Sequence, residues 1–141
     1  MTEGKEIIMD NLIEEKICKT FFDKRCSERL FYELSSKKKR SVFLYKMCHD
    51  SEKYLGKCIY KTSDRPFDVK EIERFFGREK CYCLSLRKEI DGLYSDLSKI
   101  LDLLWSNGMP YLIVNAECTM AYLETEYNFN EHKSFFLKLH L

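Results

Sequence analysis

Apolar residues recur at helical spacing in the first part of the chain and predict two helices. Over residues 3–22, Ile13, Ile17 and Phe21 are spaced by four, and charged residues fill most of the other positions. A second helix is expected over residues 27–34, because its first residue is a serine, a favourable N-cap. Each of these helices is expected to bury one apolar face.

Two further helices are predicted in the middle of the chain. Asp68 is a good N-cap, Glu71 occupies the capping-box position and Gly77 supplies a stop, so a short helix is expected between them. The longest apolar stripe then runs through residues 87–106. Gly108 follows this stripe and is expected to end the helix.

Branched and aromatic residues predict strands in the remaining segments. Residues 41–48 and 54–60 are expected to pair as a hairpin across the polar residues between them. The other strands are expected at residues 80–86, 111–115, 118–127 and 135–141. Hairpins require antiparallel pairing, and the long helix needs a face to cover. We therefore expect an α+β fold, an antiparallel or mixed sheet of about five to six strands with roughly two to four helices packed mainly on one face.

The composition is typical of one globular domain. The chain has 141 residues, and we expect a helical N-terminal segment, 1–36, and a sheet-containing body, 41–141. The net charge of +1 gives no global field to attract nucleic acid or an anionic membrane. No apolar run reaches the roughly 18 residues that a membrane-spanning helix needs. Because residues 1–16 also lack the apolar stretch of a signal peptide, the cytoplasm is the expected location.

Cysteine and glycine spacing gives no indication of a metal or a cofactor. The seven cysteines are an odd number in a chain without an export signal, so we expect reduced thiols. Cys81 and Cys83 are the one close pair, whereas zinc sites prefer CxxC-type spacing. The five glycines are dispersed, so no glycine-rich phosphate loop can form. We expect neither a metal nor a cofactor.

An enzyme is one alternative, either acyltransferase-like or a cysteine-dependent hydrolase. Cys118 and His132 flank the last predicted strands and could meet in space. Glu124 and Glu126 share a face of one strand, where two carboxylates can share a proton. Ordinary structural roles explain both sets more simply, so no catalytic residue is assigned.

Nucleic-acid binding is a second alternative, carried by a short basic run. The run consists of Lys37, Lys38, Lys39 and Arg40. Basic residues of this kind contact phosphates without reading the base sequence. No zinc-finger, RRM-type or KH-type pattern accompanies the run, and a solvated loop explains it as well.

The function that the sequence favours is a small protein–protein interaction module without catalysis. Immunity proteins, antitoxins and phage or viral inhibitors of a host factor act in this way, by occluding a protein partner. Aromatic residues are over-represented at binding hot spots. The candidate contact residues are Trp105, Tyr122, Glu124 and Glu126.

Overall fold

The structure is a computed structural model that describes residues 6–7, 10–107, 111–125 and 133–139. Within these ranges, the side chains at positions 6, 7, 48 and 105–107 are not part of the description.

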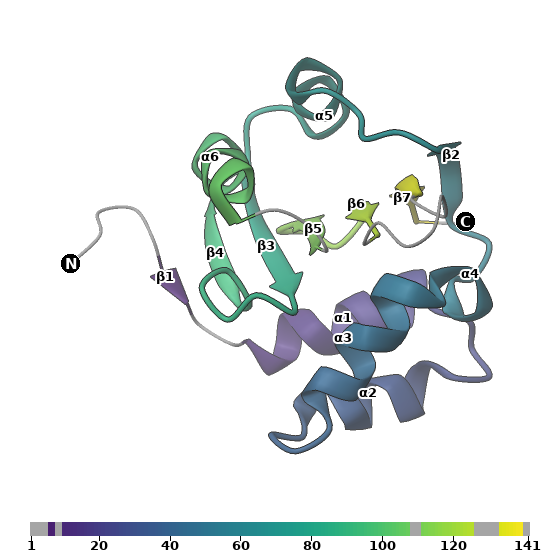
Figure 1. The fold of residues 1–141 in the computed structure, drawn as a ribbon. Helices are drawn as coiled ribbons and strands as arrows, with labels where there is room; N and C mark the ends of the chain where they lie inside the picture. Colours follow the sequence, from purple (N-terminus) through teal and green to yellow (C-terminus); the bar gives the residue numbers. More distant parts are fainter. Residues whose placement is uncertain (1–5, 8–9, 108–110, 126–132, 140–141) are drawn as a thin grey trace.

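A seven-stranded sheet forms the centre of the molecule, and its strand order is β1-β4-β3-β5-β6-β7-β2 (Figure 1). All neighbouring strands are antiparallel. The strands are β1 (Glu6–Ile7), β2 (Ile59–Ser63), β3 (Lys80–Ser85), β4 (Leu93–Asp96), β5 (Tyr111–Asn115), β6 (Met120–Glu124) and β7 (Ser134–Lys138).

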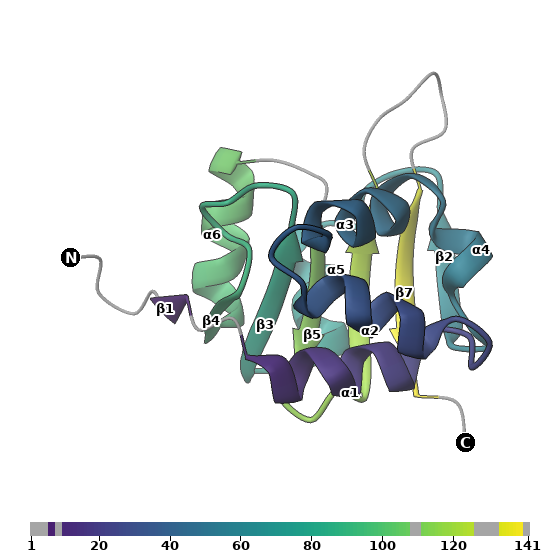
Figure 2. The same cartoon turned by 90° about the horizontal axis from the view of Figure 1, so that it is seen from below.

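Helices cover both faces of this sheet (Figures 1 and 2). Below it in Figure 1 lie α1 (Asn11–Phe21), α2 (Ser27–Ser35), α3 (Arg40–His49) and α4 (Ser51–Tyr54). Above it lie α5 (Val69–Phe76) and α6 (Leu97–Asn107). None of the helices in the described ranges is both long and apolar enough to cross a membrane.

The strands carry apolar side chains on both faces, which explains why two helical layers form. On β5, Leu112 and Val114 belong to the core between the sheet and helices α1, α2 and α3. Tyr111 and Ile113 of the same strand belong to the core shared with α5 and α6. Successive residues of a strand point to opposite faces, so a continuously apolar strand needs cover on both sides.

The predicted α+β class is confirmed, and the pairing is antiparallel rather than mixed. Most of the described helices, α1 to α4, pack on one face as expected, and α5 and α6 also cover the other face, because the core strands are buried on both sides. Helix α2, helix α5 and the strands over 80–86, 111–115, 118–127 and 135–141 are found close to their predicted places. In α5, the Asp68 carboxylate accepts a hydrogen bond of 2.8 Å from the Glu71 amide, and Gly77 ends the helix with a φ of 78°.

The predicted hairpin over residues 41–60 is wrong, because residues 40–49 form helix α3. Phe43, Leu44 and Met47 face the core, while Val42 and Tyr45 are exposed on the opposite side. A short helix with apolar residues on both sides has the same composition as a buried strand. The composition of residues 41–48 therefore favoured a strand where the protein forms a helix. In the segment 54–60, Tyr54 ends α4, Leu55 forms an isolated bridge with Phe22, and edge strand β2 begins at Ile59.

Two predicted helices are shorter than expected. The helix predicted over 3–22 begins at Asn11, where the Asp10 carboxylate caps the Leu12 and Ile13 amides, and residues 6–7 pair with β4 instead. The helix predicted over 87–106 begins only at Leu97. Its first half turns into β4, because the Gly92 amide donates back to the Cys83 carbonyl and Gly92 adopts a φ of 81°.

Candidate functional site

Arg40, the last residue of the predicted basic run, points into the protein rather than into solvent. Its guanidinium forms a bidentate pair with Glu14 (2.8 and 2.7 Å) and a second bidentate pair with Asp91 (2.8 and 3.2 Å). Its Nη1 also donates to the Leu34 carbonyl at 3.1 Å. A guanidinium has five N–H donors, and these five contacts use them all. Arg40 therefore has no donor left for a phosphate, and its predicted nucleic-acid role is corrected.

The buried Glu14 carboxylate is the centre of this network. Tyr82 donates its hydroxyl proton to Glu14 Oε2 at 2.5 Å and accepts a hydrogen bond from the Asp10 amide. Burial and the neighbouring Glu14 carboxylate raise the pKa of Tyr82 far above its ordinary value. Asp91 in turn accepts from the Ser85 amide. The network joins α1, α3, β3 and the β3–β4 turn. Because all the donors of Arg40 are used within the protein, we assign the network a structural role.

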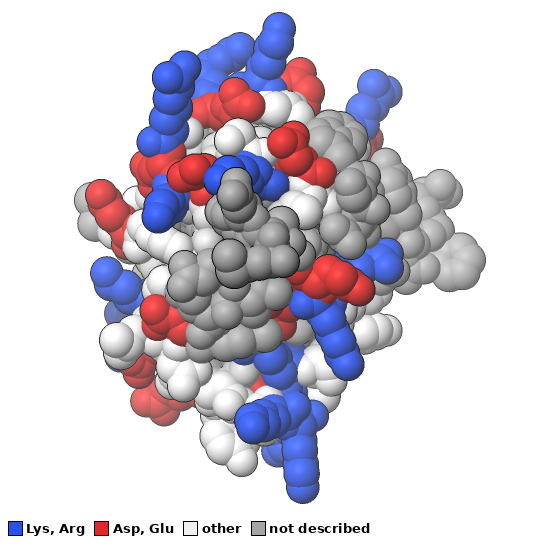
Figure 3. All heavy atoms as spheres, turned by 90° about the vertical axis from the view of Figure 1, so that its left-hand side faces the viewer, with Lys and Arg blue, Asp and Glu red and all other residues white. Residues whose placement is uncertain are grey.

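The three lysines of the basic run remain on the surface, in the turn between α2 and α3. Lys37, Lys38 and Lys39 are exposed. Lys39 Nζ lies 5.3 Å from the centre of the Tyr32 ring. Figure 3 shows lysine and arginine side chains projecting at the lower end of the molecule, where this turn lies, and charges of both signs mixed above it.

Two of the residues predicted to contact a protein partner are internal. Tyr122 is entirely buried and donates its hydroxyl proton to Glu124 Oε1 at 2.7 Å. Glu124 is itself buried, and Tyr122 also accepts a hydrogen bond from the Phe67 amide. An interface contact needs solvent access, so the prediction for this pair is corrected. The Trp105 side chain and Glu126 lie outside the described residues.

The described cysteines lie in surroundings that oppose nucleophilic chemistry. Five of them are buried, and a sixth, Cys26, is half-buried. Burial raises the pKa of Cys58 to about 11 and that of Cys81 to about 12. A thiol in such surroundings stays protonated at neutral pH, whereas the thiolate is the nucleophile. The predicted Cys118–His132 pair cannot be placed, because His132 is outside the described residues.

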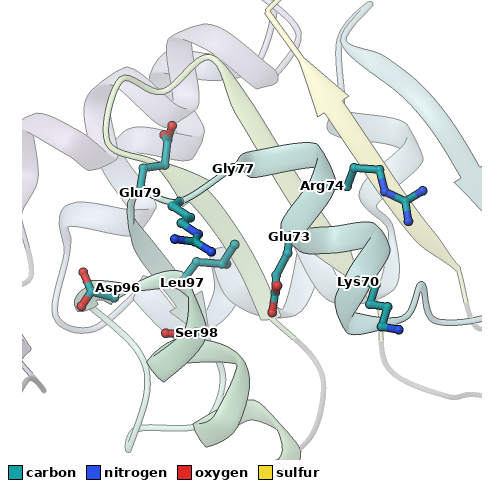
Figure 4. A pocket seen from close by; sticks show the side chains of 9 residues that line it. Lys70, Glu73, Arg74, Gly77, Glu79, Asp96, Leu97 and Ser98 are labelled. Atoms are coloured by element: carbon teal, nitrogen blue, oxygen red, sulfur yellow. The ribbon is translucent and has the colours of Figure 1, made fainter.

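The cavity between α5 and the start of α6, about 610 Å³ in volume, is lined by charged residues of both signs (Figure 4). Lys70, Arg74 and Arg78 line it together with Glu73, Glu79 and Asp96, so opposite charges balance. In Figure 4, Lys70 and Arg74 point away from Asp96 and Ser98. No cluster of three metal-ligating side chains occurs within the described ranges.

The strongest candidate site is an exposed apolar surface on the outer side of the helical layer. We name it the α2–α3 surface and define it by Tyr32, Lys39, Val42 and Tyr45. The exposed fractions of its apolar residues are 62% for Tyr32, 45% for Val42 and 56% for Tyr45. Val42 and Tyr45 are three positions apart on α3 and lie along one side of the helix, and Lys39 is the residue that caps its start. Sequence reasoning missed this surface because it assigned the segment to a strand.

Comparison with known proteins does not place the chain in a family. No family model matches it, and no curated protein or solved structure matches it either.

Proposed function

We propose that this protein is a non-catalytic protein-binding module and that a partner protein docks on the α2–α3 surface. One observation carries the proposal: α3 is apolar on both sides. Phe43 and Met47 pack into the core, while Val42 and Tyr45 face solvent. Exposed apolar side chains that lie close together mark interaction surfaces, so the side of α3 that carries Val42 and Tyr45 is suited to a partner.

The aromatic residues of this surface are held in place before any partner arrives. The Tyr45 ring stacks on the His49 ring with 4.0 Å between centroids. His49 Nδ1 lies 3.0 Å from the Tyr45 carbonyl oxygen, which fixes the second ring in turn. Side chains that are already ordered lose less entropy on binding, and tyrosine is enriched at hot spots. Tyr45 is therefore the proposed anchor of the interface.

The charge beside this surface indicates the chemistry of the partner. Lys39 lies over the Tyr32 ring, and the exposed Lys37 and Lys38 precede it in the turn between α2 and α3. Charges at the rim of an interface mainly steer the encounter and select the partner. The proposed partner thus has an apolar centre with acidic residues at its edge. An immunity protein, an antitoxin or an inhibitor of a host factor needs only a surface of this kind, since it works by occlusion.

A capture experiment with matched variants tests the proposal. Tagged protein is incubated with lysate of the organism that makes it, or of its host, and bound proteins are identified by mass spectrometry. We expect one stoichiometric partner with the unaltered protein and loss of that partner when Tyr32→Ser and Tyr45→Ser are combined. Tyr60→Ser is the matched control, because Tyr60 is 60% exposed at a different site and its loss should not affect capture. Equal capture by all three proteins, or capture by none, would show that the α2–α3 surface is not a docking site.

A further inference from the structure

A second exposed aromatic site lies at the β2 edge of the sheet, where β2, β7 and α5 meet. It is a groove of about 320 Å³, and we name it the Tyr60 groove. The charged residues that line it are Lys61, Arg74, Lys138 and Glu71. The cations outnumber the single carboxylate, so the groove favours an anionic ligand.

A stack of aromatic rings supports Tyr60 from within. The Tyr60 and Phe75 rings lie 6.1 Å apart with an interplanar angle of 29°. Phe75 packs on the buried Phe136 at 4.3 Å, and Phe136 packs on Tyr122 at 5.2 Å. The inner rings are held by the core, whereas Tyr60 is 60% exposed. The outer end of the stack is therefore a rigid aromatic platform that is open to solvent.

The cations of the groove lie near aromatic rings in the part of the chain that the structure describes. Lys138 Nζ lies 4.0 Å from the centre of the Tyr60 ring, and Lys61 Nζ lies 5.2 Å from that of Phe67. In the described part of the chain, none of Lys61, Arg74 and Lys138 forms an ion pair with a carboxylate. These cations are available to an anionic ligand whose planar group lies on the ring.

We propose that the Tyr60 groove binds single-stranded nucleic acid. An unpaired base stacks on Tyr60, and the phosphates on either side of it contact Lys61, Arg74 and Lys138. An exposed aromatic ring among cations is how proteins bind single strands without reading their sequence, because every base has a stacking face. A duplex hides its base faces and offers the groove only phosphates. This site is independent of the α2–α3 surface and of the basic run at residues 37–40.

Fluorescence anisotropy with a labelled twelve-nucleotide oligothymidylate measures the predicted binding. We expect the affinity to fall with salt at a slope of about −2 in a double-logarithmic plot, from three phosphate contacts at roughly −0.7 each for a single strand. Combining Lys61→Ala with Lys138→Ala should reduce the slope to about −0.7. Tyr60→Ala should weaken binding about tenfold, and Tyr60→Phe should retain it because a phenyl ring still stacks. Oligouridylate should bind comparably, and a DNA duplex should compete poorly.

Two controls make the outcome decisive. Tyr45→Ala removes a tyrosine of similar exposure, 56% against 60%, from the other surface and should leave oligonucleotide binding unchanged. Replacing Lys37, Lys38 and Lys39 with alanine should also leave it unchanged. The proposal is overturned by absence of binding at 50 mM NaCl, by full affinity in Tyr60→Ala, or by a loss confined to the lysine-run variant. Unchanged circular dichroism of each variant excludes unfolding as the cause.

Discussion

Arg40 and Glu14 face each other through two hydrogen bonds of 2.8 and 2.7 Å, although they are 26 residues apart in the chain. Glu14 has no exposed surface, so its negative charge depends on this guanidinium and on the hydroxyl of Tyr82. A buried carboxylate is tolerated only when it is paired and hydrogen-bonded. The pair thus fixes the start of α3 against α1.

Replacing Arg40 with methionine is expected to destabilise the fold by about 3–5 kcal/mol, since Glu14 and Asp91 would each lose a buried counter-charge. Urea unfolding followed by circular dichroism measures the change. Arg25→Met is the matched control, because Arg25 pairs with Asp23 at the surface and is 88% exposed. That control should leave the urea midpoint close to that of the unaltered protein, because solvent screens an exposed ion pair. A small effect at Arg40, equal to that of the control, would contradict the structural role of the network.

Gly77→Ala is expected to destabilise the protein by about 1–3 kcal/mol through backbone strain alone. Gly77 has a φ of 78° and a ψ of −160°, a region that side chains disfavour, yet an added Cβ would have no atom within 4 Å. Gly56→Ala is the companion variant. Its Cβ would meet atoms no nearer than 3.6 Å and its φ is ordinary, so it should leave stability unchanged or raise it slightly. Thermal unfolding of both variants compares the two positions, and equal effects would refute the assignment of strain.

Stability should decline as the pH rises above 9. A thiol in the unfolded chain has a pKa near 9.0, whereas burial raises the pKa of Cys58 to about 11 and that of Cys81 to about 12. Between these values the unfolded chain loses a proton that the folded chain retains, so each thiol lowers stability by about 1.4 kcal/mol per pH unit at most. Below pH 9 this contribution to stability is fully present.

Urea midpoints from pH 8 to pH 11 measure this decline. Cys81→Ala removes one of the titrating thiols and should flatten the pH dependence relative to the unaltered protein. If the two curves stay parallel across this range, Cys81 does not contribute to it.

Native thiols should differ sharply in reactivity. In a Cys48→Ser background, we expect iodoacetamide to modify Cys26 first, since it is half-buried while the other described cysteines are buried. Labelling for timed intervals at pH 7.5, followed by peptide mass spectrometry, gives the order. The buried thiols should react only after urea is added. Rapid native modification of Cys118 would contradict its burial and revive the cysteine-enzyme hypothesis.

Where local signals decide the structure, the sequence was sufficient to predict it. Helix α5 depends on Asp68, Glu71 and Gly77, which lie within ten positions and act on the backbone directly. Strands β3 and β5 were predicted because each is a short apolar run of residues with strand propensity. In these elements, local preference and the final fold agree.

Elements decided by distant partners could not be predicted in the same way. The start of α3 is held by Arg40, whose second partner, Asp91, is 51 residues away. The candidate sites behave similarly: Tyr60, Phe75 and Lys138 come from three elements and meet only in the folded sheet. No spacing in the sequence indicates such a groove, and exposure of Val42 and Tyr45 depends on which side of α3 packs inward.

The strand order has a consequence for the time at which this chain can fold during synthesis. Both edge strands, β1 and β2, lie in the first half of the sequence, yet they pair with β4 and β7 of the second half. Helices α1, α2 and α3 likewise leave the ribosome before the strands on which they pack have been translated. Contacts between residues so far apart in the sequence form slowly and late in folding. The apolar faces of α1, α2 and α3 in a nascent chain of this protein must therefore stay uncovered until β7 emerges, because Phe135 and Leu137 of β7 belong to the core on which they pack.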